Sequence, residues 1–270
     1  MKTILVVVGE DSLSQEVLQK AIEISVRFKA KMLVLHTIHI PFLDIPSYNH
    51  EVPLDKNRIK ESIESKVEAL RGSQMVDYYT LVYFGDPVQR AIVEAKREQV
   101  DLIITSPNIK LEKLLLEVQK NTLLIHGVSK HYHDILIPTD LSDLSKEAIK
   151  HTQRLFPQSH IRLVYGYESI VLRSSIYDIS YEEMVGYHEE NREIALKRMS
   201  QFQEELGLEG ELIDTTLSIY ESLVAYIKEK NPDLVVVASG SSESFNFGSV
   251  STYIAKMASC DVWVYCASQS

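Results

Sequence analysis

Short apolar runs alternate with helical patterns through the first half of the chain. Residues 3–8 form an apolar run that predicts a buried strand, and apolar positions at helical spacing between residues 14 and 28 predict an amphipathic helix. The alternation continues, with strands expected at residues 32–36, 78–83, 102–105 and 122–125 and helices at residues 57–70, 87–98 and, in a short form, before the last strand.

The second half of the chain repeats this pattern. Ile4 matches Ile135 at an offset of 131 residues, and Asp101-Leu-Ile-Ile104 matches Asp233-Leu-Val-Val236 at an offset of 132. The register therefore drifts by only one residue over almost a whole unit. The repeat predicts two domains, at residues 1–128 and 133–270, joined by a short linker. The second has expected strands at residues 134–139, 160–165, 211–215, 234–238 and 262–265 and a long helix at about residues 181–206.

The order of these elements predicts an α/β fold. Near-continuous Val, Ile and Leu strands that alternate with amphipathic helices are typical of a parallel sheet covered on both faces. Such sheets bind ligands beyond the carboxyl ends of their strands, where the strand order reverses. The residues that follow the first and fourth strands of each domain are therefore the candidates for chemistry.

Composition narrows the class of protein further. Hydrophobic residues make up 45% of the chain and charged residues 24%, which is ordinary for a globular protein, and no apolar run is long enough to cross a membrane. The N-terminal residues lead directly into a strand, so no secretion signal is expected. The formal net charge of −10 argues against a general affinity for nucleic acids or anionic lipid surfaces. We expect a cytoplasmic protein that binds a small molecule or another protein.

Three motifs resemble the universal stress protein family. They are Ile135-Leu-Ile-Pro-Thr-Asp140-Leu-Ser-Asp-Leu-Ser145, Gly85-Asp-Pro87 with the following Asp101-Leu-Ile-Ile104, and Gly248-Ser-Val-Ser251. The resemblance implies two tandem Rossmann-like domains of the adenine nucleotide alpha hydrolase-like kind, each with a five-stranded parallel sheet. It also implies a pseudo-dimer of the two domains through their last strands, and a homodimer is a further expectation. Many members bind ATP or AMP-like nucleotides without being efficient enzymes, and others bind no nucleotide.

Asp140 ends the first strand of the second domain, after Pro138 and Thr139. The family resemblance implies that this aspartate approaches the adenosine part of a nucleotide, where a carboxylate accepts hydrogen bonds from ribose hydroxyls. The alternative is that Asp140 or Ser142 only caps the helix that follows. The first domain has Gly9 at the matching place, so the side chain that would make this contact is missing there.

The segment after the fourth strand of the second domain resembles the family's phosphate loop in part. The resemblance places Ala238 and Ser241 at the two loop glycines and leaves six residues instead of nine before Gly248. A ligand site here would use Ala238, Ser239, Gly240, Ser241, Gly248, Ser249, Val250 and Ser251. A serine-rich turn that caps a helix would have the same composition, and Glu243 adds negative charge. The short loop favours AMP over ATP.

The first domain has no room for such a loop. Its segment from Asp101 to Asn121 is eight residues shorter than the segment from Asp233 to Asp261. Ser106-Pro-Asn-Ile-Lys110 also contains no glycine. We therefore expect a degenerate site in the first domain, which would serve as a structural or regulatory partner of the second.

The remaining candidate residues have simpler explanations. Tyrosines near the start of the long helix form a lid over a ligand or, more often, pack the helix on its sheet. The linker histidines match no zinc pattern, so no metal is expected. Cys260 and Cys266 are expected before and at the end of the last strand, without a disulfide. The tyrosines in question are Tyr165, Tyr167, Tyr177, Tyr181 and Tyr187, and the linker histidines are His126, His131 and His133.

Three functions remain open from the sequence. The first is a stress-response or signalling protein that binds an adenine nucleotide in its second domain. The second is an interaction scaffold of the same family without a nucleotide. The third is an ATP-using enzyme, but the chain has no nucleophile elbow, no Walker loop and no suitably spaced pair of carboxylates, so catalysis is not expected.

Overall fold

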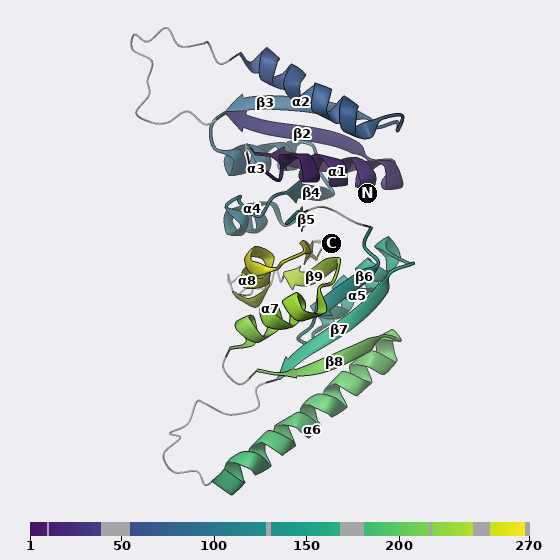
Figure 1. Ribbon diagram of the computed structural model, residues 1–270, viewed down its shortest axis with the longest axis vertical. Coiled ribbons are helices and arrows are strands. Elements are labelled where there is room, and N and C mark those ends of the chain that lie inside the picture. The colour runs from purple at the N-terminus through teal and green to yellow at the C-terminus, as the bar shows by residue number, and fades with distance from the viewer. Residues whose placement is uncertain are drawn as a thin grey trace, which may run out of the picture. The chain divides into compact units, whose positions relative to one another are not determined.

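The computed structural model describes residues 1–9, 11–38, 55–127, 131–167, 181–215, 218–239 and 249–267 (Figure 1). The chain folds into two compact units, unit 1 within residues 1–129 and unit 2 within residues 130–267. Among the helices in these ranges, none has the length and hydrophobicity of a membrane-spanning segment.

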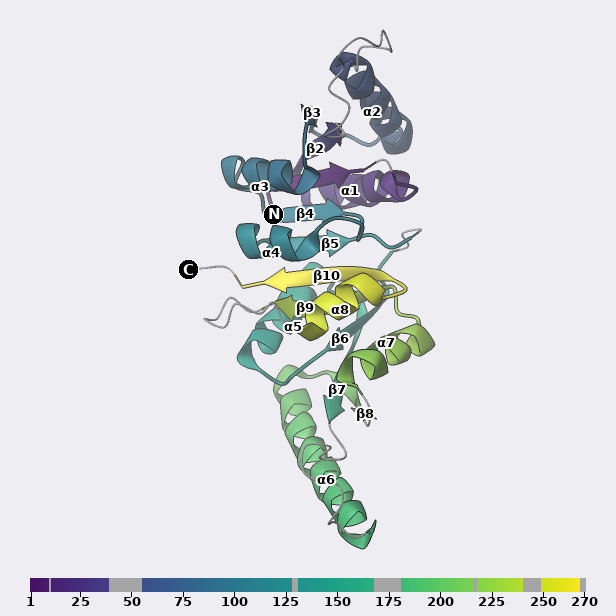
Figure 2. The ribbon, with the colours of Figure 1, turned by 90° about the vertical axis from the view of Figure 1, so that its left-hand side faces the viewer.

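Unit 1 is a parallel sheet with helices on both faces. Its described strands lie in the order β3-β2-β1-β4-β5, and every pair is parallel. The strands are β1 (Thr3–Val8), β2 (Lys31–Ile38), β3 (Tyr78–Phe84), β4 (Leu102–Thr105) and β5 (Asn121–Leu124). The helices are α1 (Ser14–Phe28), α2 (Lys56–Arg71), α3 (Pro87–Arg97) and α4 (Leu111–Val118). Figure 2 shows α1 on one side of this sheet and α3 on the other.

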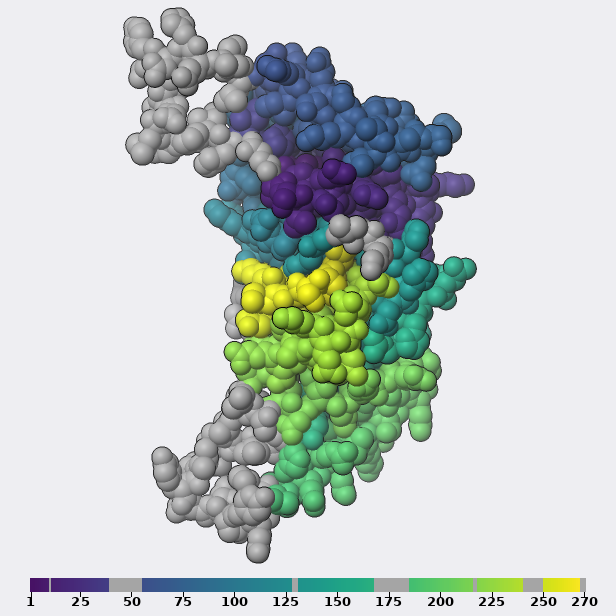
Figure 3. All heavy atoms as spheres, in the orientation of Figure 1, coloured from purple at the N-terminus to yellow at the C-terminus, as the bar shows by residue number. Residues whose placement is uncertain are grey.

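Unit 2 repeats the same topology. Its described strands lie in the order β10-β9-β6-β7-β8, which is the order of unit 1 counted from the opposite edge, and all pairs are parallel. The strands are β6 (Asp134–Pro138), β7 (His160–Tyr167), β8 (Glu209–Asp214), β9 (Leu234–Ser239) and β10 (Asp261–Cys266). The helices are α5 (Asp143–Leu155), α6 (Tyr181–Leu206), α7 (Ile219–Lys230) and α8 (Ser249–Met257). Helices α7 and α8 pack together and lie side by side on the face seen in Figure 3.

The expected element order is confirmed in both units, and the differences lie at the ends of elements. Strand β2 spans Lys31–Ile38 where residues 32–36 were expected, and β7 and β8 differ from the expected residues 160–165 and 211–215. In the structure Arg162 pairs with Glu209 and Tyr167 with Asp214. Parallel pairing therefore extends β7 by two residues and starts β8 two residues earlier, which apolar periodicity does not reveal because this edge strand is only half-buried.

The sequence repeat corresponds to an identical strand register. Ile4 pairs with Leu102 in unit 1, and Ile135 pairs with Leu234 in unit 2. The aspartates that precede β4 and β9 have the same role in both units. Asp101 accepts hydrogen bonds from the backbone N–H groups of Lys2 and Thr3, and Asp233 accepts two, each 2.9 Å, from His133 and Asp134. Each carboxylate thus fastens the beginning of the first strand to the fourth.

The sheet of unit 2 opens between β6 and β9. The two strands pair only at Ile135↔Leu234 and Leu136↔Val235, whereas β6 stays paired with β7 as far as Pro138↔Val164. Strand β9 likewise stays paired with β10 to Cys266↔Ser239. The strand order reverses at this point, which is where open α/β sheets bind ligands. The predicted residues Thr139, Asp140, Ala238 and Ser239 all follow or end the strands on either side of it.

Candidate functional site

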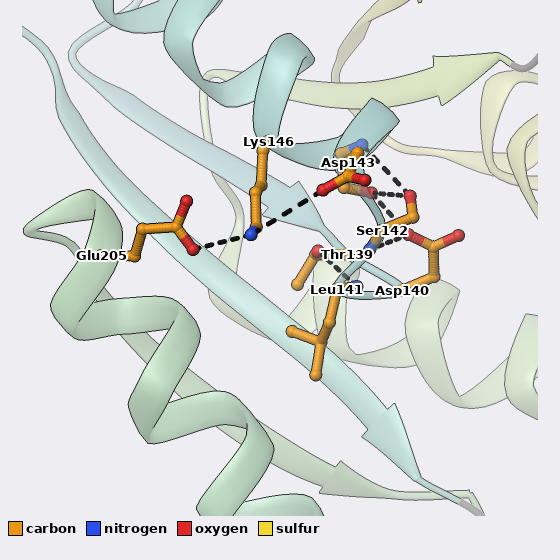
Figure 4. A network of polar contacts seen from close by, with 8 residues as sticks. Thr139, Asp140, Leu141, Ser142, Asp143, Lys146 and Glu205 are labelled. Carbon is orange, nitrogen blue, oxygen red and sulfur yellow. Dashed lines mark hydrogen bonds and ion pairs between the residues drawn. The ribbon is translucent and has the colours of Figure 1, made fainter.

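A tight turn connects β6 to α5 and contains Asp140. Ser142 begins the helix by accepting a hydrogen bond from the Ser145 N–H at 3.2 Å. The Asp140 carboxylate accepts from the Ser142 N–H at 3.0 Å and from the Ser145 hydroxyl at 2.7 Å, both through Oδ1 (Figure 4). Asp140 therefore supports the start of α5, as one interpretation of the sequence predicted. Oδ2 makes no hydrogen bond with any residue of the described chain, so a ligand hydroxyl can reach it.

The Asp140 carboxyl group is ionised at neutral pH. Burial raises the pKa of Asp140, but hydrogen bonds from Ser142 and Ser145 outweigh it and hold the pKa below its ordinary value. A carboxylate has only acceptor oxygens, so it binds hydroxyl and amino groups and repels phosphate. Asp140 is suited to a ribose and not to the phosphate of a nucleotide.

The backbone at Leu141 is in a conformation that leucine rarely adopts. Its φ is 63°, in the left-handed region, and its N–H donates to the Thr139 hydroxyl at 3.0 Å. The contacts of Thr139 and Asp140 together hold this turn in place against the steric cost. Leu141 is one of the residues that line the cavity beside this turn.

A cavity of about 390 Å³ lies next to this turn, between α5, β7 and α6. Its volume is within the range of small-molecule sites. Tyr165 and the buried Phe202 supply aromatic surface, and Arg198 is exposed on α6. The residues that line it are Asp140, Leu141, Lys146, Tyr165, Arg198, Gln201, Phe202 and Glu205.

Lys146 is fixed on the wall of this cavity by two carboxylates. Its Nζ lies 2.6 Å from Glu205 Oε2 and 3.8 Å from Asp143 Oδ1, and it lies 5.6 Å from the centre of the Phe202 ring. Figure 4 shows the ammonium group between these two carboxylates. The hydrogen bond with Glu205 raises the pKa of Lys146 and lowers the pKa of Glu205, so both groups stay charged at neutral pH. The pair ties α6 to α5.

The residues predicted after β9 are placed in part. Ser251, in the first turn of α8, donates from its hydroxyl to the Ala238 carbonyl at 2.9 Å, which brings these two predicted residues together. Ser239 is buried at the end of β9, and Ser249 and Val250 begin α8. Gly240, Ser241 and Gly248 lie outside the described residues. The Ser251 hydroxyl proton is thus used within the protein, which leaves its oxygen only as an acceptor.

Unit 1 differs at the corresponding split between its first and fourth strands. Gly9 has no side chain there, but Asp11 crosses to the segment after β4, where Oδ2 accepts from the Ser106 hydroxyl at 2.6 Å and from the Asn108 amide at 3.0 Å. Burial raises the pKa of Asp11, and the hydrogen bonds from Ser106, Asn108 and Ser14 more than compensate and lower it. The carboxylate bridges the split in unit 1. In unit 2 the segment that follows β9, residues 240–248, lies outside the described residues.

The other candidate side chains lie apart from this site, with one exception. Tyr165 lines the cavity, whereas Tyr187 is exposed. The ring centre of Tyr167 lies 6.4 Å from that of His188. Tyr177 lies outside the described residues. Cys260 precedes β10 and Cys266 ends it, the positions expected from the sequence, and the two thiols are not joined by a disulfide. Among the described residues, no group of three or more His, Cys, Asp or Glu side chains could hold a metal ion.

Several residues of the cavity were not predicted from the sequence. Those on α6 recur at positions 198, 201, 202 and 205, the spacing of one helix face, which is also the pattern of a helix that only packs on its sheet. Ser145 follows Ser142 by three residues, the spacing of a capped helix start. The missing information was which side of α6 faces the turn after β6.

Both units are Rossmann-like domains with a split at the carboxyl ends of their sheets, and comparison with known proteins identifies the family. The model of the universal stress protein family matches residues 1–115 and 131–265. The chain therefore belongs to this family and contains two of its domains in tandem, as the motifs predicted.

Solved structures support the same fold over nearly the whole chain. The chain is similar to a protein of unknown function from Pseudomonas aeruginosa PAO1, with 15% identity and a TM-score of 0.68, over 98% of this chain and 92% of that one. It is also similar to a universal stress protein from Archaeoglobus fulgidus DSM 4304, with 16% identity and a TM-score of 0.65, over 97% of each chain. No match is found among curated proteins.

Proposed function

We propose that unit 2 binds an adenine nucleotide of the AMP kind and that the protein acts in the cytoplasm as a stress-response or signalling protein, through binding and not through catalysis. The observation that carries this proposal is the Asp140 carboxylate on the wall of the unit 2 cavity. Oδ1 accepts both hydrogen bonds from its own turn, and unit 1 has Gly9 at the matching place.

The chemistry around Asp140 matches the parts of a nucleotide. The cavity beside the turn offers aromatic surface from Tyr165 and Phe202, which suits a purine ring. The ionised Asp140 suits the ribose hydroxyls. The N-terminus of α8 suits the phosphate, because backbone N–H groups and the helix dipole there favour an anion. We assign the base to the cavity, the ribose to Asp140 and the phosphate to the first turn of α8.

Titration of the purified full chain with AMP, ADP, ATP and adenosine by calorimetry tests this proposal. We expect AMP to bind more tightly than ATP, because the loop before Gly248 is short and Glu243 adds negative charge. Asp140→Ala should weaken AMP binding by about tenfold or more, since a hydrogen bond to a charged group contributes about 1.5–3 kcal/mol.

A matched variant separates the ligand contact from the structural contact of Asp140. Ser145→Ala removes the 2.7 Å bond to Oδ1 and keeps the carboxylate. It should loosen the start of α5 and leave AMP affinity within a factor of about three. Equal loss in Ser145→Ala and Asp140→Ala would mean that Asp140 only shapes the turn. Absence of binding by all four ligands would favour a nucleotide-free scaffold of the same family, which the shortened loop also suits.

A further inference from the structure

Unit 1 contains a second cavity, of about 480 Å³, in the place that corresponds to the cavity of unit 2. Each lies between the first helix of its unit, the helix that follows the second strand, and the ends of the first two strands. Strand register makes His36 on β2 the counterpart of Tyr165 on β7, and both line their cavities. The residues around the unit 1 cavity are Val8, Gly9, Asp11, Ser14, Leu18, His36, Arg58, Ile59, Ser62, Ile63 and Lys66.

The charges of the two cavities differ. In unit 2 the two cations Lys146 and Arg198 face two carboxylates, Asp140 and Glu205. In unit 1 the two cations Arg58 and Lys66 face one carboxylate, Asp11, which is already occupied by hydroxyl and amide donors. Gly9 stands where unit 2 has Asp140, so the second carboxylate is absent from the unit 1 cavity.

The two cations lie on one face of α2. Arg58, Ser62 and Lys66 follow each other at intervals of four residues, which places them in one row along the helix. Within the described residues no carboxylate pairs with Arg58 or Lys66. Other cations of the same helix are paired, Lys60 with Glu64 at 3.8 Å and Arg71 with Glu68 at 2.5 Å. Arg58 and Lys66 therefore differ from Lys60 and Arg71, whose charges are paired with carboxylates of the same helix.

The inner wall of the cavity is apolar and has one polar group. Val8, Leu18 and Ile63 are buried there. The buried His36 lies 3.0 Å through Nδ1 from the Val8 carbonyl oxygen. A carbonyl oxygen only accepts, so Nδ1 donates, and Nε2 is the ring nitrogen left for a ligand or for water. The volume exceeds that of an inorganic anion and suits a small organic molecule.

From this arrangement we propose that unit 1 binds a small amphipathic organic anion, with its apolar part against Val8, Leu18 and Ile63 and its anionic group between Arg58 and Lys66. This ligand differs from an adenine nucleotide, for which unit 1 has neither a ribose-binding aspartate at Gly9 nor room for a phosphate loop. The two units would then sense two different small molecules.

Calorimetric titration of the full chain with octanoate, and with octanol as the neutral analogue of the same length, tests the proposal. We expect one octanoate to bind per chain and octanol to bind at least fivefold more weakly. The double variant Arg58→Gln/Lys66→Gln should weaken octanoate about fivefold or more, the effect of losing two exposed ion pairs, and should leave octanol unchanged. The matched double variant Lys60→Gln/Arg71→Gln should bind octanoate like the parent.

A blocking variant tests the location independently of charge. Ser62 is exposed on the rim, so Ser62→Trp fills the mouth without altering the core, and circular dichroism checks that the fold is kept. Octanoate binding should be lost in this variant, while AMP binding at unit 2 should be unchanged. Failure of octanoate to bind the parent would overturn the proposal, as would octanoate binding that survives both Ser62→Trp and Arg58→Gln/Lys66→Gln.

Discussion

Replacement of Gly210 by alanine should destabilise unit 2 by overpacking the interface between α6 and the sheet. A Cβ atom at position 210 would lie 2.2 Å from Met199 Cε, 2.9 Å from Leu163 Cβ and 3.0 Å from the Leu163 carbonyl oxygen. Met199 can turn its flexible end away, but the Leu163 Cβ and carbonyl oxygen are fixed by the backbone of β7, where Leu163 is fully buried. The strand or α6 must therefore move.

The expected cost is about 1–3 kcal/mol, the range of overpacked cores. Gly186→Ala is the matched control, because this glycine lies within α6 and a Cβ there meets no atom within 4 Å. The same substitution should stabilise the protein there, by about 1 kcal/mol at most, through helix propensity. Because α6 forms one wall of the unit 2 cavity, where we propose that AMP binds, Gly210→Ala should also weaken AMP binding, and Gly186→Ala should not.

Urea denaturation followed by circular dichroism measures both changes in the free energy of unfolding. The expected result is a lower midpoint for Gly210→Ala and an equal or higher midpoint for Gly186→Ala. A Gly210→Ala protein as stable as the parent would refute the reasoning, because it would mean that Gly210 on β8 does not approach Leu163 on β7 as closely as described.

Two further predictions concern ionisable groups. Burial raises the pKa of Asp101, but hydrogen bonds from the Lys2 and Thr3 backbone outweigh it and place the folded-state pKa below the ordinary value of 3.8. The stability that this carboxylate contributes is therefore present above pH 3.8, and it is lost as the pH falls through the folded-state pKa. Asp101→Ala should therefore cost about 1 kcal/mol at pH 7 by urea denaturation and less at pH 3.5; a cost independent of pH would contradict the role of the charge. Burial raises the pKa of the Cys260 thiol to about 12 and that of Cys266 to about 11, so neither should react with iodoacetamide at pH 7.5 until the protein is denatured. Mass spectrometry counts the alkylated thiols, and rapid labelling of the native protein would show that these thiols are not held as described.

The fold could be predicted from the sequence because its signals are local and repeated. The apolar runs identified the strands, and the match of Asp101 to Asp233 reflects a shared contact, since both carboxylates fasten the first strand to the fourth. Strand ends were less predictable. The pairing of β7 with β8 determines where β7 ends and where β8 begins, and these two strands are distant from each other in the sequence.

The site could be predicted only where one residue carries the signal. Asp140 was identified from its position after a strand, but the walls of its cavity come from α6, and no local pattern says which face of a helix meets a turn some 60 residues away. The comparison of Gly9 with Asp140 likewise missed Asp11, two residues further on, which reaches the segment after β4 through side-chain geometry. For the same reason the cavity of unit 1 and its row of cations were not predicted.

Hydrogen exchange of the full chain with and without saturating AMP tests the central claim most directly, because it locates the ligand as well as detecting it. Added protection is expected in the turn and first helical residues at 139–146 and along α6 at 198–206, and no change is expected at residues 8–18 or 58–66 of unit 1. Protection confined to unit 1, or no protection anywhere at a saturating AMP concentration, would contradict the assignment of the nucleotide site to unit 2.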